Sequence, residues 1–175
     1  MLARSENMIV TYEMLKESLT DYRAKDNKIK RMADNKEIIK LTRNLYETNK
    51  NAPGYVVANA IYSPSYLSFD YALAYYGLIP EAVYTYTSAT FGKGKKKLYK
   101  NDFGTYGTYT YRDVPTHIYP YGLQIFQEQD YSYVMAIPEK ALCDKLYTLK
   151  VVRNKKDMYD LLFNDLRIDM DVLKH

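Results

Sequence analysis

A basic helical pattern runs directly into a basic hairpin pattern near the start of the chain, and this pairing narrows the folds open to it. Residues 24–34 read as a helix, because Ile29, Met32 and Ala33 recur at helical spacing and polar residues fill the other positions. Asn35 follows the last helical residue and can adopt the left-handed conformation that ends many helices. We therefore expect a short helix with one buried stripe.

The hairpin pattern follows at once. Residues 37–42 and 45–48 read as two strands joined at Arg43 and Asn44, and Asn tolerates the positive φ that a tight hairpin turn requires. A helix that enters the major groove, followed by a hairpin or wing that lies along the backbone, is how a winged helix-turn-helix holds duplex DNA. The sequence therefore predicts a DNA-binding unit of this kind.

Charge supports the same interpretation. From residue 22 to residue 43 eight Lys or Arg stand against three acids, a local net charge of +5, whereas the whole chain carries +4. Local positive charge attracts phosphate and makes binding depend on salt. The alternative is an ordinary solvated helix face with surface lysines. The candidate DNA-binding residues are Arg23, Lys25, Asn27, Lys28, Lys30, Arg31, Lys40 and Arg43.

These residues are expected to divide the work. Asn27 and Arg31 should read bases, since Asn pairs with adenine edges and Arg with guanine edges. Lys40 and Arg43 of the hairpin should contact phosphate. Lys25, Asn27, Lys28 and Arg31 should face outward, opposite the buried stripe.

A second helix and a hinge complete the expected N-terminal unit. Residues 11–19 read as a helix with Tyr12, Leu15 and Leu19 at helical spacing. Residues 49–54 are rich in turn-forming residues, so we place a domain boundary there. Residues 1–50 are then the winged-helix domain and residues 51–175 a mixed α+β domain with an antiparallel sheet.

The second domain should combine helices and strands. Residues 55–62 read as a helix, and Ser68 should cap a helix that ends at Tyr76 with Gly77 in a Schellman motif. A hairpin should join residues 83–90 to residues 105–112. Further strands are expected at residues 116–119, 122–127 and 131–137. Pro138 should open a helix with Leu142, Leu146 and Leu149 as its stripe, and short helices should follow at residues 155–164 and 169–173.

The tip between residues 90 and 105 is lysine-rich. Lys93, Lys95, Lys96 and Lys97 form a candidate functional surface for the second domain, with a solvated loop as the alternative. The glycines there lack the spacing of a phosphate-binding P-loop.

Chemistry-bearing residues are sparse. The one cysteine, Cys143, excludes a disulfide within the chain, and no His, Cys and carboxylate cluster has metal-ligand spacing, so no cofactor or metal is expected. Glu139, Asp144 and Lys145 fall on one predicted helix and read as a helix face, not as a nuclease-like set. No signal-peptide pattern or apolar run of about 20 residues is present, which favours a cytoplasmic protein.

Four segments resemble the AbiEi antitoxin family, the regulators of type IV toxin–antitoxin systems that act in phage defence by abortive infection. They are the N-terminal helix and wing (residues 28–32, KIKRM, with 37–46, EIIKLTRNLY), and residues 58–81 (ANAIYSPSYLSFDYALAYYGLIPE), 83–87 (VYTYT) and 138–144 (PEKALCD). Their order and spacing carry the resemblance, which covers about residues 12–150. Asn44 and Asn35 stand where that family usually has Gly, and the gap at residues 20–23 indicates a reduced helix-turn-helix.

The resemblance implies a non-enzymatic protein with two roles. Its N-terminal domain would repress its own operon by binding inverted repeats in the promoter, as a monomer or weak dimer in solution that pairs on DNA. Its second domain would oppose a nucleotidyltransferase toxin without forming a stable complex. Two alternatives stay open, a stand-alone regulator with no toxin partner and a nucleic-acid-processing enzyme whose site lies in residues 51–175.

Overall fold

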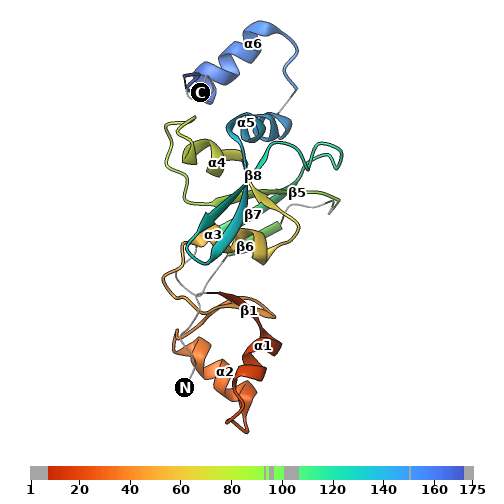
Figure 1. The fold of residues 1–175 in the computed structure, drawn as a ribbon. Coiled ribbons are helices and arrows are strands. Elements are labelled where there is room, and N and C mark those ends of the chain that lie inside the picture. Colours follow the sequence, from red (N-terminus) through yellow and green to blue (C-terminus); the bar gives the residue numbers. More distant parts are fainter. Residues whose placement is uncertain (1–7, 93, 95–96, 101–106, 150, 172–175) are drawn as a thin grey trace.

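The computed structural model describes residues 8–92, 94, 97–100, 107–149 and 151–171, which form a mixed α+β protein with two sheets (Figure 1). Its helices are α1 (Tyr12–Ser18), α2 (Lys25–Asp34), α3 (Gly54–Ile61), α4 (Phe69–Tyr75), α5 (Pro138–Tyr147), α6 (Lys155–Tyr159) and the π-helical turn η1 (Asp160–Asp165). Its strands are β1 (Ile9–Thr11), β2 (Ile39–Thr42), β3 (Leu45–Glu47), β4 (Tyr66–Leu67), β5 (Tyr86–Thr90), β6 (Lys97–Lys100), β7 (Thr108–Asp113), β8 (Leu123–Glu128) and β9 (Tyr131–Ala136).

The first sheet gathers the N-terminal elements. It is antiparallel with the order β1-β3-β2, and α1 and α2 lie beside it at one end of the molecule (Figure 1). Seven buried side chains pack between these elements: Val10, Leu15, Leu19, Ile29, Met32, Ile38 and Tyr46. The helices and strands expected in this region are therefore confirmed. Of the expected stripes, Leu15, Leu19, Ile29 and Met32 are buried, whereas Tyr12 and Ala33 are half-buried.

The end of α2 departs from expectation. Asn35 has a φ of −80°, so it is not left-handed, whereas Lys36 has a φ of 57°. The Lys36 N–H donates to the Ala33 carbonyl at 3.0 Å and the Glu37 N–H donates to the Met32 carbonyl at 2.8 Å. This is a Schellman ending in which Lys36 takes the position usually held by glycine. The expected left-handed residue was one position too early, because Asn35 still makes a helical hydrogen bond, its N–H donating to the Arg31 carbonyl at 2.9 Å.

Replacing Lys36 by glycine should stabilise the protein. A side chain at this φ costs roughly 1–2 kcal/mol, which glycine would avoid. Glycine also loses more chain entropy on folding, and this offsets roughly 0.5–1 kcal/mol of the gain. We therefore expect a gain of about 0.5–1 kcal/mol in the free energy of unfolding, measured with urea. Lys36→Ala, which keeps the Cβ, is the control and should show no such gain; equal effects of the two changes would contradict the backbone explanation.

The hairpin turn is also built differently from the expectation. Neither Arg43 nor Asn44 has a positive φ, and the pairing of β2 with β3 shifts register between Lys40 and Thr42. An irregularity in the strand therefore accommodates the turn, so the turn does not need a residue that tolerates positive φ.

The second sheet is mixed, not antiparallel. Its order is β6-β7-β5-β4-β9-β8, with β5 parallel to β7 and β4 parallel to β9. The expected hairpin between residues 83–90 and 105–112 is therefore wrong. The segment that joins them contains β6, which pairs antiparallel with the outer edge of β7. A connection of this length can carry the chain across to a parallel register.

Two further expected elements are absent from the described chain. Residues 116–119 form turns, with the Ile118 N–H donating to the Pro115 carbonyl at 3.1 Å. Pro115 and Pro120 flank this segment, and proline cannot donate to a strand ladder. Residues 170–171 form a turn where a helix was expected, and residues 172–173 lie outside the described residues.

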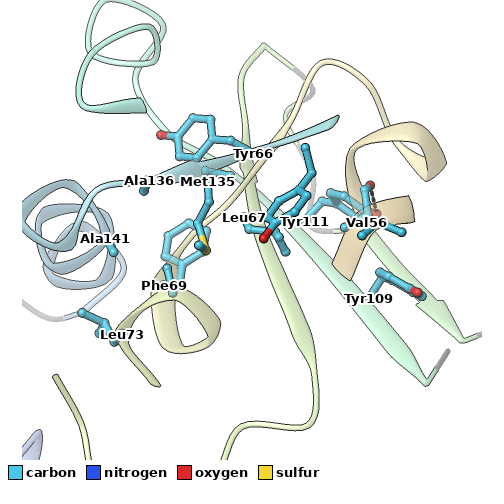
Figure 2. Close-up of a cluster of buried hydrophobic side chains, with 14 of the residues drawn as sticks. Val56, Tyr66, Leu67, Phe69, Leu73, Tyr109, Tyr111, Met135, Ala136 and Ala141 are labelled. Carbon is cyan, nitrogen blue, oxygen red and sulfur yellow. Dashed lines mark hydrogen bonds between the residues drawn. The ribbon is translucent and has the colours of Figure 1, made fainter. Parts of the chain in front are cut away.

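Helices cover both faces of the second sheet, with α3 on one side and α4 and α5 on the other (Figure 1). The hydroxyls of Tyr109 and Tyr111 in β7 donate to the Gly54 and Ala58 carbonyls of α3, at 3.0 and 2.7 Å. Tyrosine thus fills the core while its hydroxyl is satisfied by a helix carbonyl. Figure 2 shows Phe69 and Met135 near the middle of this core.

The C-terminal end of α4 is as expected, whereas its N-terminal end is not. Gly77 has a φ of 74°, and the Leu78 N–H donates to the Leu73 carbonyl at 2.8 Å, so the expected Schellman ending is confirmed. Ser68 stands at the N-cap position, but its side chain makes no capping hydrogen bond. Its hydroxyl donates to Asp144 instead, at 2.8 Å.

Helix α5 begins at Pro138, as expected, but buries a different face. Its buried residues are Lys140, Ala141 and Asp144, whereas the expected stripe of leucines is only half-buried. The leucine spacing was misleading because a charged pair occupies the inner side of the helix.

A carboxylate joins the two sheets. Glu47 of β3 is fully buried, and its Oε1 accepts hydrogen bonds from the Asn49 N–H at 2.7 Å and from the Tyr131 hydroxyl of β9 at 2.8 Å. Burial raises the pKa of Glu47. Ile39 of β2 also packs into the larger core.

Candidate nucleic-acid interface

An open groove of about 1070 Å³ lies between α2 and the β2–β3 hairpin. One wall comes from α2 through Ile29, Lys30 and Ala33, and the other comes from the hairpin through Lys40 and Arg43. The two segments that the sequence paired as reading helix and wing therefore line one concave surface.

Among the charged residues that line the groove, basic groups predominate. Five cationic side chains contribute to it, against two carboxylates. The cations are Lys30, Lys36, Lys40, Arg43 and Lys50, and the carboxylates are Asp26 and Asp34. An excess of cations along a concave surface attracts a polyanion and raises its association rate.

One of the two carboxylates is held by a neighbouring helix. The Tyr12 hydroxyl donates to Asp26 Oδ1 at 2.7 Å, and Lys16 Nζ lies 3.3 Å from the same oxygen. The hydrogen bond to Asp26 raises the pKa of Tyr12 to about 12, and the hydrogen bond from Tyr12 lowers the pKa of Asp26. Asp26 therefore ties α1 to α2 and has a cation of its own, which reduces its repulsion of a phosphate in the groove.

The structure separates the candidate DNA-binding residues into three groups. Lys30, Lys40 and Arg43 line the groove. Arg23, Asn27 and Arg31 are exposed outside its lining, and Asn27 and Arg31 lie about one turn apart on α2. Lys25 and Lys28 are half-buried.

Lys25 and Lys28 were expected to face outward, but both are half-buried. Lys25 lies one turn before Ile29, on the buried side of the helix. Lys28 Nζ lies 5.4 Å from the centroid of the Tyr22 ring, a cation–π geometry. Sequence reasoning also missed Lys50, which it assigned to the hinge, although Lys50 follows β3 closely enough to reach the groove.

A closed polar network occupies the inner side of α5. Asp144 is fully buried; its Oδ1 lies 2.8 Å from Lys140 Nζ, and its Oδ2 accepts from the Tyr66 hydroxyl at 2.9 Å and the Ser68 hydroxyl at 2.8 Å. Lys140 Nζ also donates to the Ile118 carbonyl at 3.2 Å. Burial, and then the Asp144 charge, raise the pKa of Tyr66. Each oxygen of the carboxylate has a donor, as a buried charge requires.

Two of the segments that carry the family resemblance contribute residues to this network. The segment at residues 58–81 supplies Tyr66 and Ser68, and the segment at residues 138–144 supplies Lys140 and Asp144. The sequence signal that could have found the pair is a Lys and an Asp four residues apart on one helix, which places their side chains on the same face.

The nuclease-like set considered from the sequence does not converge. Glu139 is exposed, Asp144 points into the buried network, and Lys145 Nζ pairs with Asp70 at 2.5 Å. The helix-face interpretation is therefore wrong for Asp144. Cys143 is exposed on α5. Within the described ranges no group of three His, Cys, Asp or Glu could hold a metal ion.

The lysine-rich tip is only partly described. Lys93, Lys95 and Lys96 lie outside the described residues, and Lys97 begins β6. Its proposed role is therefore carried by the sequence alone.

No protein-family model matches the chain, and no curated protein matches it. The resemblance to the AbiEi family thus stays an interpretation of its four segments. In the part of the chain that the structure describes, no helix is long and apolar enough to cross a membrane.

Proposed function

We propose that this protein is a DNA-binding repressor of its own operon, with residues 1–50 as its winged-helix domain. The observation that carries the proposal is the basic groove shared by α2 and the β2–β3 hairpin. The element order β1, α1, α2, β2, β3, with β1 completing a three-stranded sheet, supports a reduced helix-turn-helix followed by a wing. Asn27 and Arg31 are exposed on α2, and in this proposal they are the residues that meet base edges in the major groove.

Binding to paired sites is part of the proposal. A single module of this size buries only about 600–1,000 Å² on DNA, which gives weak operator control. Two copies on an inverted repeat in the promoter, coupled by protein contact or DNA bending, would supply the missing affinity. The symmetry of the operator would then mirror the symmetry of the pair.

Removing one hairpin charge should weaken binding to all DNA sequences alike. Lys40 and Arg43 line the groove but belong to the hairpin, so we expect them to neutralise phosphates. Lys40→Ala or Arg43→Ala should lower the slope of log affinity against log salt by about one. Titrations of promoter and scrambled duplexes at several salt concentrations measure this. A change in which duplex is preferred would mean that the hairpin reads bases.

We further propose that residues 51–175 act as an antitoxin against a nucleotidyltransferase toxin, without a stable complex. This part rests on the resemblance of residues 58–81, 83–87 and 138–144 to the AbiEi family. Co-expression of the full chain with an adjacent nucleotidyltransferase gene tests it by growth. Rescue supports the antitoxin, whereas operator repression without rescue favours the stand-alone regulator.

A further inference from the structure

A second cavity, of about 200 Å³, lies on the face of the larger sheet that α4 and α5 cover. Its sheet wall comes from the parallel pair β5 and β7, where Thr87 stands opposite Thr110. Arg112 lies two residues beyond Thr110 and therefore on the same face of the sheet. Lys145 and Thr148 close the cavity from the end of α5. We refer to it as the Arg112 cavity.

Part of the lining is already occupied by internal contacts. The Thr87 hydroxyl accepts from the Tyr71 N–H at 3.0 Å and donates to the Ser68 carbonyl at 2.6 Å, and the Thr148 hydroxyl donates to the Lys145 carbonyl at 2.8 Å. Arg112 differs, because its guanidinium makes no ion pair with any residue in the described part of the chain. This half-buried cation thus has no carboxylate of the described residues within ion-pair distance, although Asp70 lines the same cavity.

The charges around Arg112 select an anion. Lys145 and Arg112 contribute two positive charges, and Asp70, 2.5 Å from Lys145 Nζ, contributes one negative charge. The carbonyl end of α5 is a second unfavourable feature, because it carries partial negative charge. A carboxylate, with a single negative charge, gains little against the repulsion from Asp70 and from the carbonyl end of α5. A phosphate dianion can instead engage the Arg112 guanidinium through two oxygens and the Thr110 hydroxyl through a third.

The size of the cavity sets the extent of the ligand. Sites that enclose a drug-sized ligand have volumes of about 300–1,000 Å³, so the Arg112 cavity is too small for a whole nucleotide. It can hold a phosphate group while the rest of a phosphate ester stays outside.

The backbone beside the cavity is strained. Phe69, which lines it, has a φ of 54°, although it carries a bulky side chain and its position is buried. Such a conformation costs of order 1–3 kcal/mol and persists where the surrounding structure holds it, often at ligand sites. Here it brings Asp70 and the start of α4 against Lys145.

We propose that the Arg112 cavity binds a phosphate group, either as free phosphate or as the terminal phosphate of a nucleotide. The proposal goes beyond DNA binding and does not depend on it. The Arg112 cavity is lined by the larger sheet and by α4 and α5, whereas the basic groove lies between α2 and the β2–β3 hairpin. A bound phosphate group would supply an ion-pair partner for Arg112 and would compete with Asp70 for Lys145.

Titration of the full chain with inorganic phosphate, at constant ionic strength and followed by amide NMR, tests the proposal. We expect saturable shifts of the Thr87, Thr110 and Arg112 amides. A hydrogen bond to a charged group changes affinity by roughly ten- to one-hundred-fold, so Arg112→Gln should weaken binding by at least about tenfold. Arg153→Gln, which removes an exposed arginine elsewhere, is the matched control and should bind as the wild type does.

A second variant and a second probe sharpen the result. Thr110→Val should weaken phosphate binding while the amide spectrum remains that of a folded protein. This variant tests the proposal even if Arg112→Gln disturbs the sheet. Adenosine 5′-monophosphate that shifts the same amides at lower concentration than phosphate would identify a nucleotide as the source; equal affinity would identify free phosphate. The proposal is overturned if phosphate shifts only residues of the basic groove, or if both variants bind as the wild type does.

Discussion

Replacing Asp144 by alanine should lower the free energy of unfolding by about 3–5 kcal/mol, because it leaves the buried Lys140 ammonium without its partner. The carboxylate is fully buried and serves three donors, from Lys140, Tyr66 and Ser68. Domains of ordinary stability unfold with about 5–15 kcal/mol, so this loss is a large fraction of the total. Urea unfolding followed by circular dichroism measures it.

Two variants distinguish the network from general damage to α5. Glu139→Ala, on the exposed side of the same helix, should stay within about 0.5 kcal/mol of the wild type. Lys140→Met combined with Asp144→Leu should recover part of the loss, since it removes both charges and leaves no unpaired ion. A single Asp144→Ala variant as stable as the wild type would mean that the network does not hold the helices to the sheet.

Replacing Arg31 by alanine should weaken promoter binding by about 1–3 kcal/mol, a factor of roughly 5–150 in the dissociation constant. Arg31 is exposed on α2, outside the lining of the groove, and Asn27 lies one turn earlier. A lost base contact should cost most on the promoter and little on unrelated DNA, unlike the loss of a phosphate contact.

The appropriate control for Arg31 is a change of charge far from α2. Arg153→Ala removes one exposed arginine beyond α5 and should leave promoter affinity unchanged. Competition between promoter and scrambled duplexes measures discrimination for both variants. If Arg31→Ala lowers affinity for the two duplexes equally, Arg31 contacts phosphate and not bases.

Local sequence patterns located most elements because a buried stripe and a turn residue act within a few positions. The spacing of Ile29 and Met32 fixed the inner side of α2, and Gly77 marked the end of α4. The hydrophobic periodicity of residues 24–34 also placed Arg31 on the outer side. Such features depend on contacts within one helix.

Strand pairing and buried polar groups could not be obtained in this way. Alternation in residues 83–90 and 105–112 indicates strands, but whether they pair parallel depends on where β6 lies. The inward position of Asp144 depends on donors in β4 and at the start of α4, nearly eighty positions away in the sequence. The groove likewise could not be predicted, since Lys30 and Arg43 line one concave surface only once the hairpin lies beside α2.

Amide NMR of the full chain, titrated with a duplex of its own promoter, tests whether α2 and the β2–β3 hairpin bind DNA. We expect shifts concentrated in α2 and in residues 39–45, with Asn27 and Arg31 among the most affected, and their loss when salt is raised. Shifts confined to the larger sheet and its helices, or no shifts with promoter DNA at low salt, would contradict this expectation.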